Sequence, residues 1–585
     1  MLKQLIHKGV IIPDPPEYQG LHIYIDGKKI QLTPKQEEMA YAWAKKKDTP
    51  YVQDLVFIKN FLLDFSKELG YEKPLTLDQI DFSELYQRVD DERAAREALT
   101  KEERKALAAQ RKQVRENLKE MYGYAIADGE HIELATYMTE PSGIFMGRGK
   151  HPLRGRWKEG AQKKDVTLNL SPDAGIDRTE WKQVVWQPET LWVAKWEDSL
   201  SGKLKYIWLH DTAPVKQTRE AQKFDKAIEL NAKLEEVRSH IAAGLTHENP
   251  RIRKIATACY LIDTLCLRVG DEKDPEEADT VGATTLRPEH VKIHDDGMVE
   301  FRFLGKDSVL WHKKMQLSDT IIENLRELSE KARPSTSNRG NKKHPIYSKP
   351  QLFPDVSSRN VNAFLSEAMP GLSAKVFRTH HATHVVRESL QNSDVNAEDP
   401  QYKKWEAATR ANTEAAILCN HTKQAPKNWR ERKQRYKERE KRAKERLKKI
   451  KDLQKELDQK LKDLKKEAVE KKKAAKDKEQ RQKVKERYDK RIEKLLARID
   501  RTNVREEKAN IALGKLKAQM AIAMKNRTWN LNTSQKSYID PRVFYNWGQS
   551  VDYDVLEKYY SKTLRNKFQW VKNKELNPEL VEKDD

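Results

Sequence analysis

One long segment, from about Lys427 to Lys525, restricts the fold more than any other feature of the sequence. It consists largely of Lys, Arg, Glu, Gln and Ala, and its apolar residues recur every three or four positions. These residues form two a/d seams, Leu453, Leu457, Leu461, Leu464 and Ala468 in one, and Val484, Tyr488, Ile492, Leu495 and Ile499 in the other. The stretch Glu470–Arg481 between them loses the pattern. The sequence therefore predicts an antiparallel helical hairpin whose arms, each about 35 residues long, extend roughly 50 Å.

The chain carries a large surplus of positive charge. Among its 585 residues, 113 Lys and Arg stand against 91 Asp and Glu, giving a formal net charge of +22, and only 37% of residues are hydrophobic. Such a surplus lies on surfaces or extensions and favours a polyanionic partner, most often nucleic acid. The length allows several domains and excludes a single small binding module.

Cysteines and apolar runs indicate the cellular environment. Cys259, Cys266 and Cys419 cannot form a disulfide framework and lack the CxxC spacing of zinc sites, so we expect a reducing compartment. The N-terminal stretch MLKQLIHKGVIIPDPPEY has charged interruptions and no cleavage-site pattern, which disfavours secretion. No stretch approaches the roughly 20 consecutive apolar residues of a membrane-spanning helix. We expect no membrane span.

The composition divides the chain into four predicted domains, residues 1–216, 217–426, 427–525 and 526–585. The first mixes α and β structure, with a helix over Thr33–Lys47, a charged helical run over Asp90–Tyr122, and a hairpin of Leu191–Trp196 and Lys203–Leu209 joined at a Ser-Gly turn. The fold class expected for the whole chain is therefore α+β and multidomain.

The second predicted domain is mainly helical, as the apolar spacing of Arg251–Leu267 indicates. An Asp-Gly turn predicts a β insertion in it, with strands over Val291–His294, Met298–Leu304 and Ser308–His312. The last domain regains aromatic residues but is too short to build much core alone. We expect it to be helical and to dock on the second domain.

Common catalytic signatures are missing. Gly305-Lys306 is followed by Asp307 and lacks the preceding glycine of a phosphate-binding GxxxxGK[ST] loop. His380 and His384 have metal-ligand spacing, but an HExxH motif needs Glu where His381 stands and no clear third ligand follows. A helix end that faces DNA, or ordinary packing, explains these histidines better than a metal site.

Five further residues remain as candidates. Arg268 ends an apolar helix, Lys306 lies in the strand turn FLGKDS, Arg378 in AKVFRTHH, His421 in ILCNH, and Tyr538 in SYIDPR, where Asp540 can cap a helix that begins at Pro541. Taken singly, each has a structural explanation, such as pairing of the arginine with a nearby carboxylate or packing of the tyrosine.

Together, these residues and their surroundings resemble the eukaryotic-type type IB DNA topoisomerases. The resemblance covers nearly the whole chain through the segments DGKKIQLTPKQEEMAYAWAKK, GIFMGRGKHP, LCLRVGDEKDPEEADTVGATTLRPEH, FLGKDS, KVFRTHHATH, AILCNHTKQAPK, SYIDPR and KYYSKTLRNKFQW. The long charged N-terminal extension of nuclear members is absent, so an archaeal or minimal relative also fits. The resemblance implies a DNA-clamping cap over 1–216, a tyrosine-recombinase-like catalytic domain over 217–426, a coiled-coil linker, and a C-terminal domain that carries the nucleophile.

The resemblance also implies roles for the five candidates: Tyr538 is the nucleophile, Arg268, Arg378 and His421 hold the scissile phosphate, and Lys306 is the general acid. The chemistry agrees, because a phenol with an ordinary pKa near 10 attacks poorly at neutral pH without a concentrated positive field. Guanidiniums and an imidazole supply that field and donate to the non-bridging oxygens. One phosphodiester is exchanged for another, so religation needs no ATP, and neither a metal nor another cofactor is expected.

The implied partner is duplex DNA, preferentially supercoiled, bound by a monomer during replication and transcription. DNA-contacting positions expected from the resemblance and from the basic Gly-rich loop are Arg148, Lys150, His151, Lys375, Asp307 and Ser537. Arg154 and Arg156 lie in the same loop. We also expect the Lys-rich hairpin to slow the rotating duplex, which deletion of residues 441–510 tests through processivity and religation rate.

Two departures from the family concern inhibitors. Ser537 stands where eukaryotic members usually carry Asn, and Met146 where an arginine is common. Since the Asn amide is associated with camptothecin contact in the family, we expect reduced but not abolished sensitivity, with Arg148 and Asp307 retained.

Two other interpretations remain open. A tyrosine recombinase shares the nucleophile and the cations but usually shows His-x-x-Arg, where this chain has Lys375-x-x-Arg378, and it lacks a rod before the tyrosine. An architectural DNA-binding protein explains the positive charge and the helical rod. It gives no reason why the five candidate catalytic residues occur together. In each case the protein is expected inside the cell, in an archaeal nucleoid or a eukaryotic nucleus.

Overall fold

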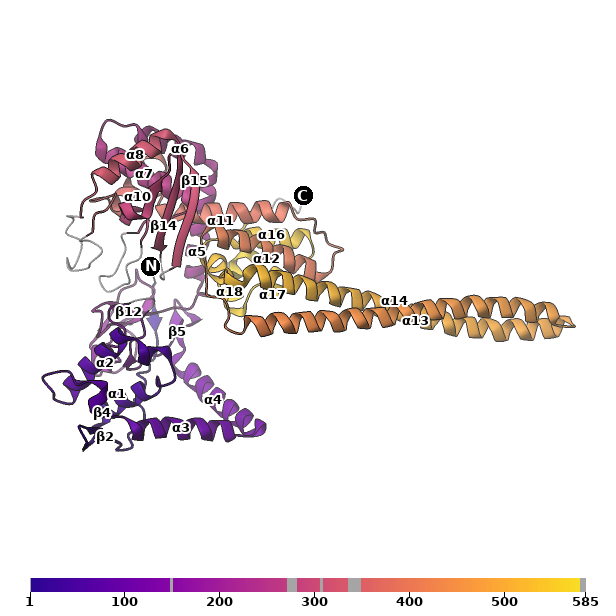
Figure 1. Ribbon diagram of the computed structural model, residues 1–585, viewed down its shortest axis with the longest axis horizontal. Coiled ribbons are helices and arrows are strands. Elements are labelled where there is room, and N and C mark those ends of the chain that lie inside the picture. Colours follow the sequence, from indigo (N-terminus) through magenta and orange to yellow (C-terminus); the bar gives the residue numbers. More distant parts are fainter. Residues whose placement is uncertain (1, 148–150, 271–280, 306–308, 335–348, 579–585) are drawn as a thin grey trace. The chain divides into compact units, whose positions relative to one another are not determined.

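The computed structural model describes residues 2–147, 151–270, 281–305, 309–334 and 349–578. The chain divides into two compact units. The first comprises Met1–Lys223, Glu235–Ile262 and Arg268–Ala374, and the second comprises Phe224–Leu234, Asp263–Leu267 and Lys375–Asp585. Figure 1 shows the mixed α+β architecture, with several small sheets and one long helix pair. Within the described ranges, no helix has the length and apolar character needed to cross a bilayer.

The first unit begins with a helical layer around an aromatic core. Three helices pack against a small sheet: α1 (Pro34–Ala44), α2 (Leu55–Glu68) and α3 (Ser83–Ala98). The strand order of this sheet is β3 (Lys28–Gln31), β2 (His22–Ile25), β4 (Ile80–Asp81). Trp43 stacks on Phe61 with ring centroids 4.6 Å apart at the centre of this core. Thr33 caps α1, which confirms the helix predicted over Thr33–Lys47.

The charged run predicted to be helical over Asp90–Tyr122 is helical, and it consists of two helices. Helix α3 ends at Ala98, and α4 (Lys101–Tyr122) begins after Thr100, whose side chain accepts from the Glu103 amide in a capping box. A reciprocal cap of this kind stabilises a helix start even inside a uniformly charged sequence. The helical prediction is confirmed, except at the break that precedes this cap.

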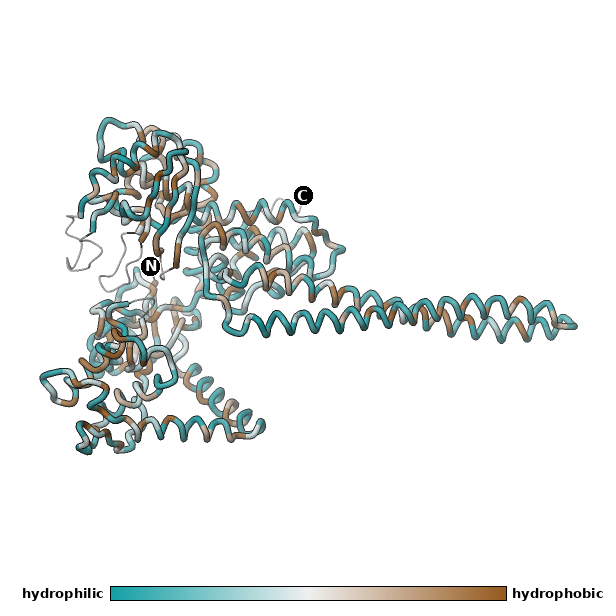
Figure 2. The backbone as a smooth tube through the Cα atoms, viewed as in Figure 1, coloured by the Kyte–Doolittle hydropathy of each residue, from teal (hydrophilic) through white to brown (hydrophobic). Residues whose placement is uncertain are grey.

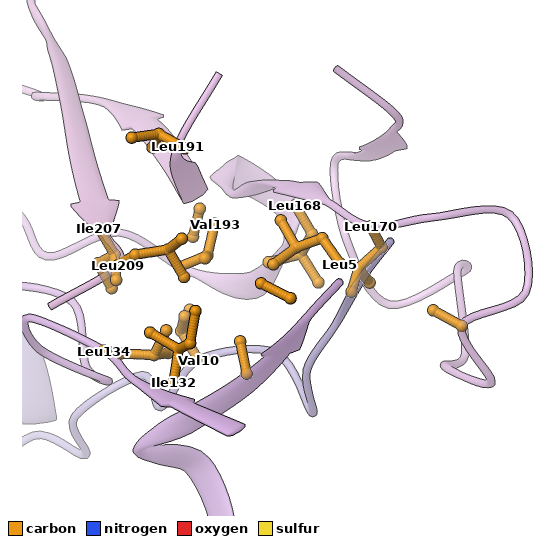
Figure 3. Packing of buried hydrophobic residues seen from close by; sticks show 14 of the residues in the cluster. Leu5, Val10, Ile132, Leu134, Leu168, Leu170, Leu191, Val193, Ile207 and Leu209 are labelled. Atoms are coloured by element: carbon orange, nitrogen blue, oxygen red, sulfur yellow. The ribbon is translucent and has the colours of Figure 1, made fainter. Parts of the chain in front are cut away.

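A second core joins two sheets of the first unit. One has the order β1 (Leu5–Ile6), β5 (Tyr124–Ala127), β6 (Glu130–Glu133), and the other β10 (Gln183–Val185), β9 (Thr167–Asn169), β11 (Trp192–Glu197), β12 (Leu204–Trp208). Figure 3 shows Leu5, Leu168, Val193 and Ile207 converging between them. Strands β11 and β12 confirm the predicted hairpin, with Gly202 at φ 67° in its turn.

His7, next to β1, makes the stability of this core dependent on pH. Burial lowers the pKa of its imidazole to about 4, and its ring nitrogens bond the Asn169 carbonyl and the Gly9 amide at 3.1 Å. The neutral form is therefore favoured in the folded state. Its stabilisation is complete above pH 6.5 and is lost as the pH falls towards 4, a change of about 3 kcal/mol. We expect the protection factors of the amides in β1 and β5, which correct for the intrinsic exchange rate at each pH, to fall as the pH drops through this window, and to fall less in His7→Gln. Equal falls in both proteins would contradict this expectation.

The rest of the first unit carries the predicted β insertion. Strands β13 (Val291–Ile293), β14 (Met298–Gly305) and β15 (Val309–Gln316) form an antiparallel sheet in that order, which confirms the prediction from the Asp-Gly turn. The helices around it are α5 (Pro214–Ala232), α6 (Leu234–Leu245), α7 (Pro250–Leu265), α8 (Asp319–Glu330) and α10 (Ser358–Ala368). Helices α5 and α7 contribute their ends to the second unit.

Further short elements complete the described chain. Strands β7 (Gly143–Ile144) and β8 (Trp157–Lys158) pair, and the short 3-10 helices are η1 (Pro50–Gln53), η2 (Leu77–Gln79), η3 (Lys163–Asp165), η4 (Ala283–Thr285), η5 (Pro288–His290), η7 (Asn526–Thr528) and η8 (Gln569–Lys572).

The second unit is helical. Helices α11 (Ala374–Gln391) and α12 (Gln401–Leu418) lie with α15 (Leu531–Ser537), α16 (Pro541–Ser550), α17 (Val555–Lys558) and α18 (Lys562–Lys567). Helix α12 packs on both α14 and α15. Asp540 caps α16 by accepting from the Arg542 amide, as its Asp-Pro sequence predicts.

The long helix pair confirms the predicted hairpin, but its arms have 46 and 48 residues rather than the roughly 35 predicted. Helix α13 (Trp429–Ala474) packs along α14 (Lys478–Lys525), and Asp477 caps the start of α14. Every predicted seam residue is buried or half-buried, and Leu457, Tyr488 and Ile499 are the most buried of them. Figure 2 shows that hydrophilic residues predominate along both helices.

Candidate active site

Arg378 is held rigidly on α11 in the second unit. Only 4% of the residue is exposed. Its Nη1 donates to the Cys266 carbonyl at 2.7 Å and its Nη2 to the Cys419 carbonyl at 3.0 Å. These two carbonyls become accessible because α7 and α12 end there: Cys266 and Asn420 have φ of 52°, a left-handed conformation that terminates a helix. The buried Nε has no hydrogen-bond partner within the described ranges.

His421 follows α12 and faces Arg378. Its Nε2 lies 3.3 Å from Arg378 Nη2, and its Nδ1 lies 2.7 Å from Ser534 Oγ on α15. The His421 backbone is also fixed, since its amide donates to the Ala416 carbonyl and its carbonyl accepts from the Asn530 amide. The imidazole is thus bound from both its own helix end and the segment that leads to Tyr538.

Tyr538 ends α15 with its ring against the side chains of both Arg378 and His421. The ring centroid lies 4.8 Å from the Arg378 guanidinium carbon and 5.4 Å from the His421 ring centroid. Its amide donates to the Ser534 carbonyl at 2.9 Å, and its carbonyl accepts from Thr383 Oγ1 on α11 at 3.3 Å. Only 4% of Tyr538 is exposed. Three of the five predicted catalytic residues therefore meet in the second unit.

The other two candidates lie elsewhere in the chain. Arg268 belongs to the first unit, where it is half-buried and its carbonyl accepts from the Ala283 amide. Lys306 lies outside the described residues, as do Asp307, Arg148 and Lys150.

Comparison with known proteins identifies the family. The model of the eukaryotic DNA topoisomerase I catalytic core matches residues 212–457, that of the DNA-binding fragment matches residues 2–209, and that of the C-terminal topoisomerase domain matches residues 502–579. Human mitochondrial DNA topoisomerase I is 32% identical over 583 residues, covering 97% of this chain and 89% of the relative. Human DNA topoisomerase 1 is 33% identical over 443 residues, covering 73% of this chain and 55% of the relative.

The chain belongs to the eukaryotic DNA topoisomerase I family. It is a type IB DNA topoisomerase, an isomerase that binds DNA. The resemblance seen in its sequence motifs is confirmed.

The described part of the basic loop in this topoisomerase is a hairpin loop between β7 and β8. Arg154 and Arg156 do not extend from it, because Arg154 pairs with Asp54 at 2.7 Å and Arg156 with Asp64 at 2.8 Å on α2. Gly155 has φ 92°, and an added Cβ would lie 2.1 Å from the Phe57 carbonyl oxygen, so only glycine allows this approach. The two arginines anchor the loop on α2.

The remaining predicted DNA-contacting positions differ in exposure. Lys375 is exposed on α11, one turn before Arg378, while His151 and Ser537 are half-buried. The His151 Nδ1 accepts from the Leu153 amide at 3.1 Å. Met146, which stands where the family often has arginine, packs on the aromatic core of the first unit.

Sequence reasoning missed the residues that support the cluster. Thr383 joins α11 to the nucleophile and to the segment after it, since its Oγ1 donates to the Tyr538 carbonyl and also accepts from the Asp540 amide at 3.0 Å. Ser534 was detectable, because it lies four residues before Tyr538 and so on the same helix face. His381, which stands where an HExxH motif would need Glu, contacts Asp263 at 2.6 Å.

Proposed function

We propose that this topoisomerase relaxes positive and negative supercoils by cutting one DNA strand through Tyr538, allowing rotation, and resealing the strand without ATP or a required metal. The observation that carries this proposal is the contact of the buried Tyr538 ring with both Arg378 and His421. A phenol surrounded by fixed cationic and hydrogen-bonding groups is suited to attack a phosphodiester.

In the proposed reaction the Tyr538 oxygen loses its proton and bonds to the scissile phosphorus. The bond from phosphorus to the 5′ oxygen breaks, and Lys306 protonates that oxygen, leaving a 3′-phosphotyrosine and a free 5′ hydroxyl. Arg268, Arg378 and His421 stabilise the added negative charge on the non-bridging oxygens. The unpartnered Nε of Arg378 supports this role, because a buried guanidinium donor without an acceptor fits an incoming anion. Religation is the reverse reaction.

The proposed division of labour follows the four sequence ranges. Residues 1–216 clamp DNA, and Arg148, Lys150 and His151 lie near the bound duplex. Residues 217–426 form a tyrosine-recombinase-like catalytic domain, in which Lys375 and Asp307 lie beside the DNA. Residues 427–525 link this catalytic domain to the C-terminal domain. We propose that the active species is a monomer. The net charge of +22 supports phosphate contacts that give affinity without sequence readout.

Relaxation of supercoiled plasmid in EDTA, without nucleotide, tests the proposed function. We expect positively and negatively supercoiled plasmids to relax through a covalent adduct on the 3′ DNA end, which peptide mapping assigns to Tyr538. Activity confined to one recombination site would indicate a recombinase, and binding without relaxation would indicate an architectural protein. Either result would reject the proposal.

Ser537 gives a prediction about inhibition by camptothecin. Because Ser537 lacks the amide that the family presents before its nucleophile, we expect weak trapping of the cleaved complex and about 2- to 10-fold stronger trapping in Ser537→Asn, the gain from one hydrogen bond. Drug-dependent cleavage of a labelled duplex measures this effect, with Ser550→Asn at an exposed site on α16 as the control. Equal trapping by wild type and Ser537→Asn would contradict the prediction.

A further inference from the structure

Ser534 bonds both of the groups that the proposed reaction brings together. Its side-chain Oγ lies 2.7 Å from His421 Nδ1, and its carbonyl accepts from the amides of Tyr538 at 2.9 Å and Ile539 at 3.2 Å. The residue is fully buried on α15. One residue thus fixes the imidazole through its side chain and the nucleophile through its backbone.

The contacts of His421 determine which nitrogen carries its hydrogen. A guanidinium can only donate, so Arg378 Nη2, 3.3 Å away, requires Nε2 to accept. The ring hydrogen of the neutral imidazole is then on Nδ1 and is donated to Ser534 Oγ.

Binding of a phosphate changes the requirement at Nε2. To donate to a non-bridging oxygen, Nε2 must gain a hydrogen while Nδ1 keeps its own, which makes the ring an imidazolium. Without an acceptor at Nδ1, this cation would have a buried, unsatisfied N–H. A carboxylate there would satisfy the N–H but cancel the positive charge, whereas a hydroxyl satisfies it and leaves the full charge for the phosphate.

We propose that Ser534 is a positioning residue, which orients His421 and supports its cationic form so that Nε2 donates to the scissile phosphate. This inference rests on the proposed function. Among the contacts recorded for the described residues, the titratable side chains from other elements that face His421 are Arg378 from α11 and Tyr538 from the end of α15. Both are unchanged in a Ser534 variant, so the ratio of variant to wild-type rate at each pH isolates the effect on His421.

The test is single-turnover cleavage of a duplex whose short 5′-hydroxyl fragment dissociates after cutting, measured from pH 6 to 8.5. At pH 8 we expect Ser534→Ala to cleave roughly 10- to 100-fold more slowly than wild type, from loss of a hydrogen bond to a charged group. The deficit shrinks several-fold towards pH 6, because the imidazolium is lost as the pH rises and is lost earlier without its acceptor. Ser534→Thr, which keeps the hydroxyl, cleaves within about threefold of wild type across the range.

Thr413→Val provides the matched control. It removes a hydroxyl that is equally buried in the second unit and bonds Asn526 at 2.9 Å, but Thr413 has no recorded contact with His421. A merely structural loss predicts a deficit independent of pH, as expected for Thr413→Val. If Ser534→Ala shows such a flat ratio, or Ser534→Thr is as slow as Ser534→Ala, the inference is wrong.

Two further readouts keep the test decisive. If Ser534→Ala does not fold by circular dichroism, Ser534→Cys replaces it, and its weak thiol acceptor should give the same pH trend at smaller amplitude. Wild-type cleavage that forms no adduct on Tyr538 would reject the proposed function itself. A normal wild-type adduct with a flat variant ratio would reject only the role of Ser534.

Discussion

We expect the replacement of Tyr538 by phenylalanine to abolish covalent DNA cleavage, with a rate at least about 10⁴-fold below wild type. The substitution removes only the attacking oxygen. The remaining ring keeps its place beside Arg378 and His421, at the 4.8 and 5.4 Å of the native contacts, and phenylalanine also packs favourably against a guanidinium. DNA affinity should therefore stay within about twofold of wild type, since phosphate contacts elsewhere provide it.

Transfer of labelled DNA to protein, together with plasmid relaxation, measures the effect of Tyr538→Phe. Tyr545→Phe is the matched control, because Tyr545 is half-buried on α16 and has no contact with the Arg378–His421 cluster among those recorded. The control should cleave normally. Residual adduct formation by Tyr538→Phe at more than about one hundredth of the wild-type rate would mean that another nucleophile acts.

The parts of the fold that sequence predicts well are those with a strong local signal. Tyr488 and Ile499 fall on the predicted seam because heptad spacing alone specifies one buried stripe. Gly297, with φ 80°, makes the predicted turn before β14 because few other residues adopt that conformation. The break at Thr100 was missed because a single cap interrupts a run whose composition is helical on both sides.

The family motifs indicate that Arg378, His421 and Tyr538 belong to one site, but local sequence patterns do not. The whole α13–α14 hairpin separates His421 from Tyr538 in the chain, yet the Lys423 amide donates to the Thr528 carbonyl at 2.8 Å and closes the base of that hairpin. Such a long-range pairing leaves no periodic trace in the sequence. The carbonyls of Cys266 and Cys419 could not be predicted as partners of Arg378 either, because every residue has a backbone carbonyl and only the fold selects two of them.

The second large effect is expected at Arg378. In Arg378→Ala, cleavage should fall about 10³-fold, the cost of removing a preorganised donor from a site where negative charge develops. Arg378→Lys keeps the charge but loses the planar fork that reaches the Cys266 and Cys419 carbonyls together, so it should remain about 10²-fold slow. An ammonium can approach one carbonyl closely but cannot reproduce both contacts and the one to His421.

Folding must be separated from chemistry in these variants, because Arg378→Ala leaves two buried carbonyls without their donor, at about 1–3 kcal/mol each. Thermal melting and filter binding of DNA should be recorded beside single-turnover cleavage. Arg410→Ala is the control, because it truncates the same type of side chain. Arg410 lies on the exposed face of α12, where it pairs only with Glu406 among the described contacts. We expect Arg378→Lys, which keeps a donor for one of the two carbonyls, to melt between Arg378→Ala and wild type and to bind DNA normally while cleaving slowly. Wild-type cleavage by this variant would show that charge alone suffices, and normal cleavage by a folded Arg378→Ala would remove Arg378 from the proposed active site.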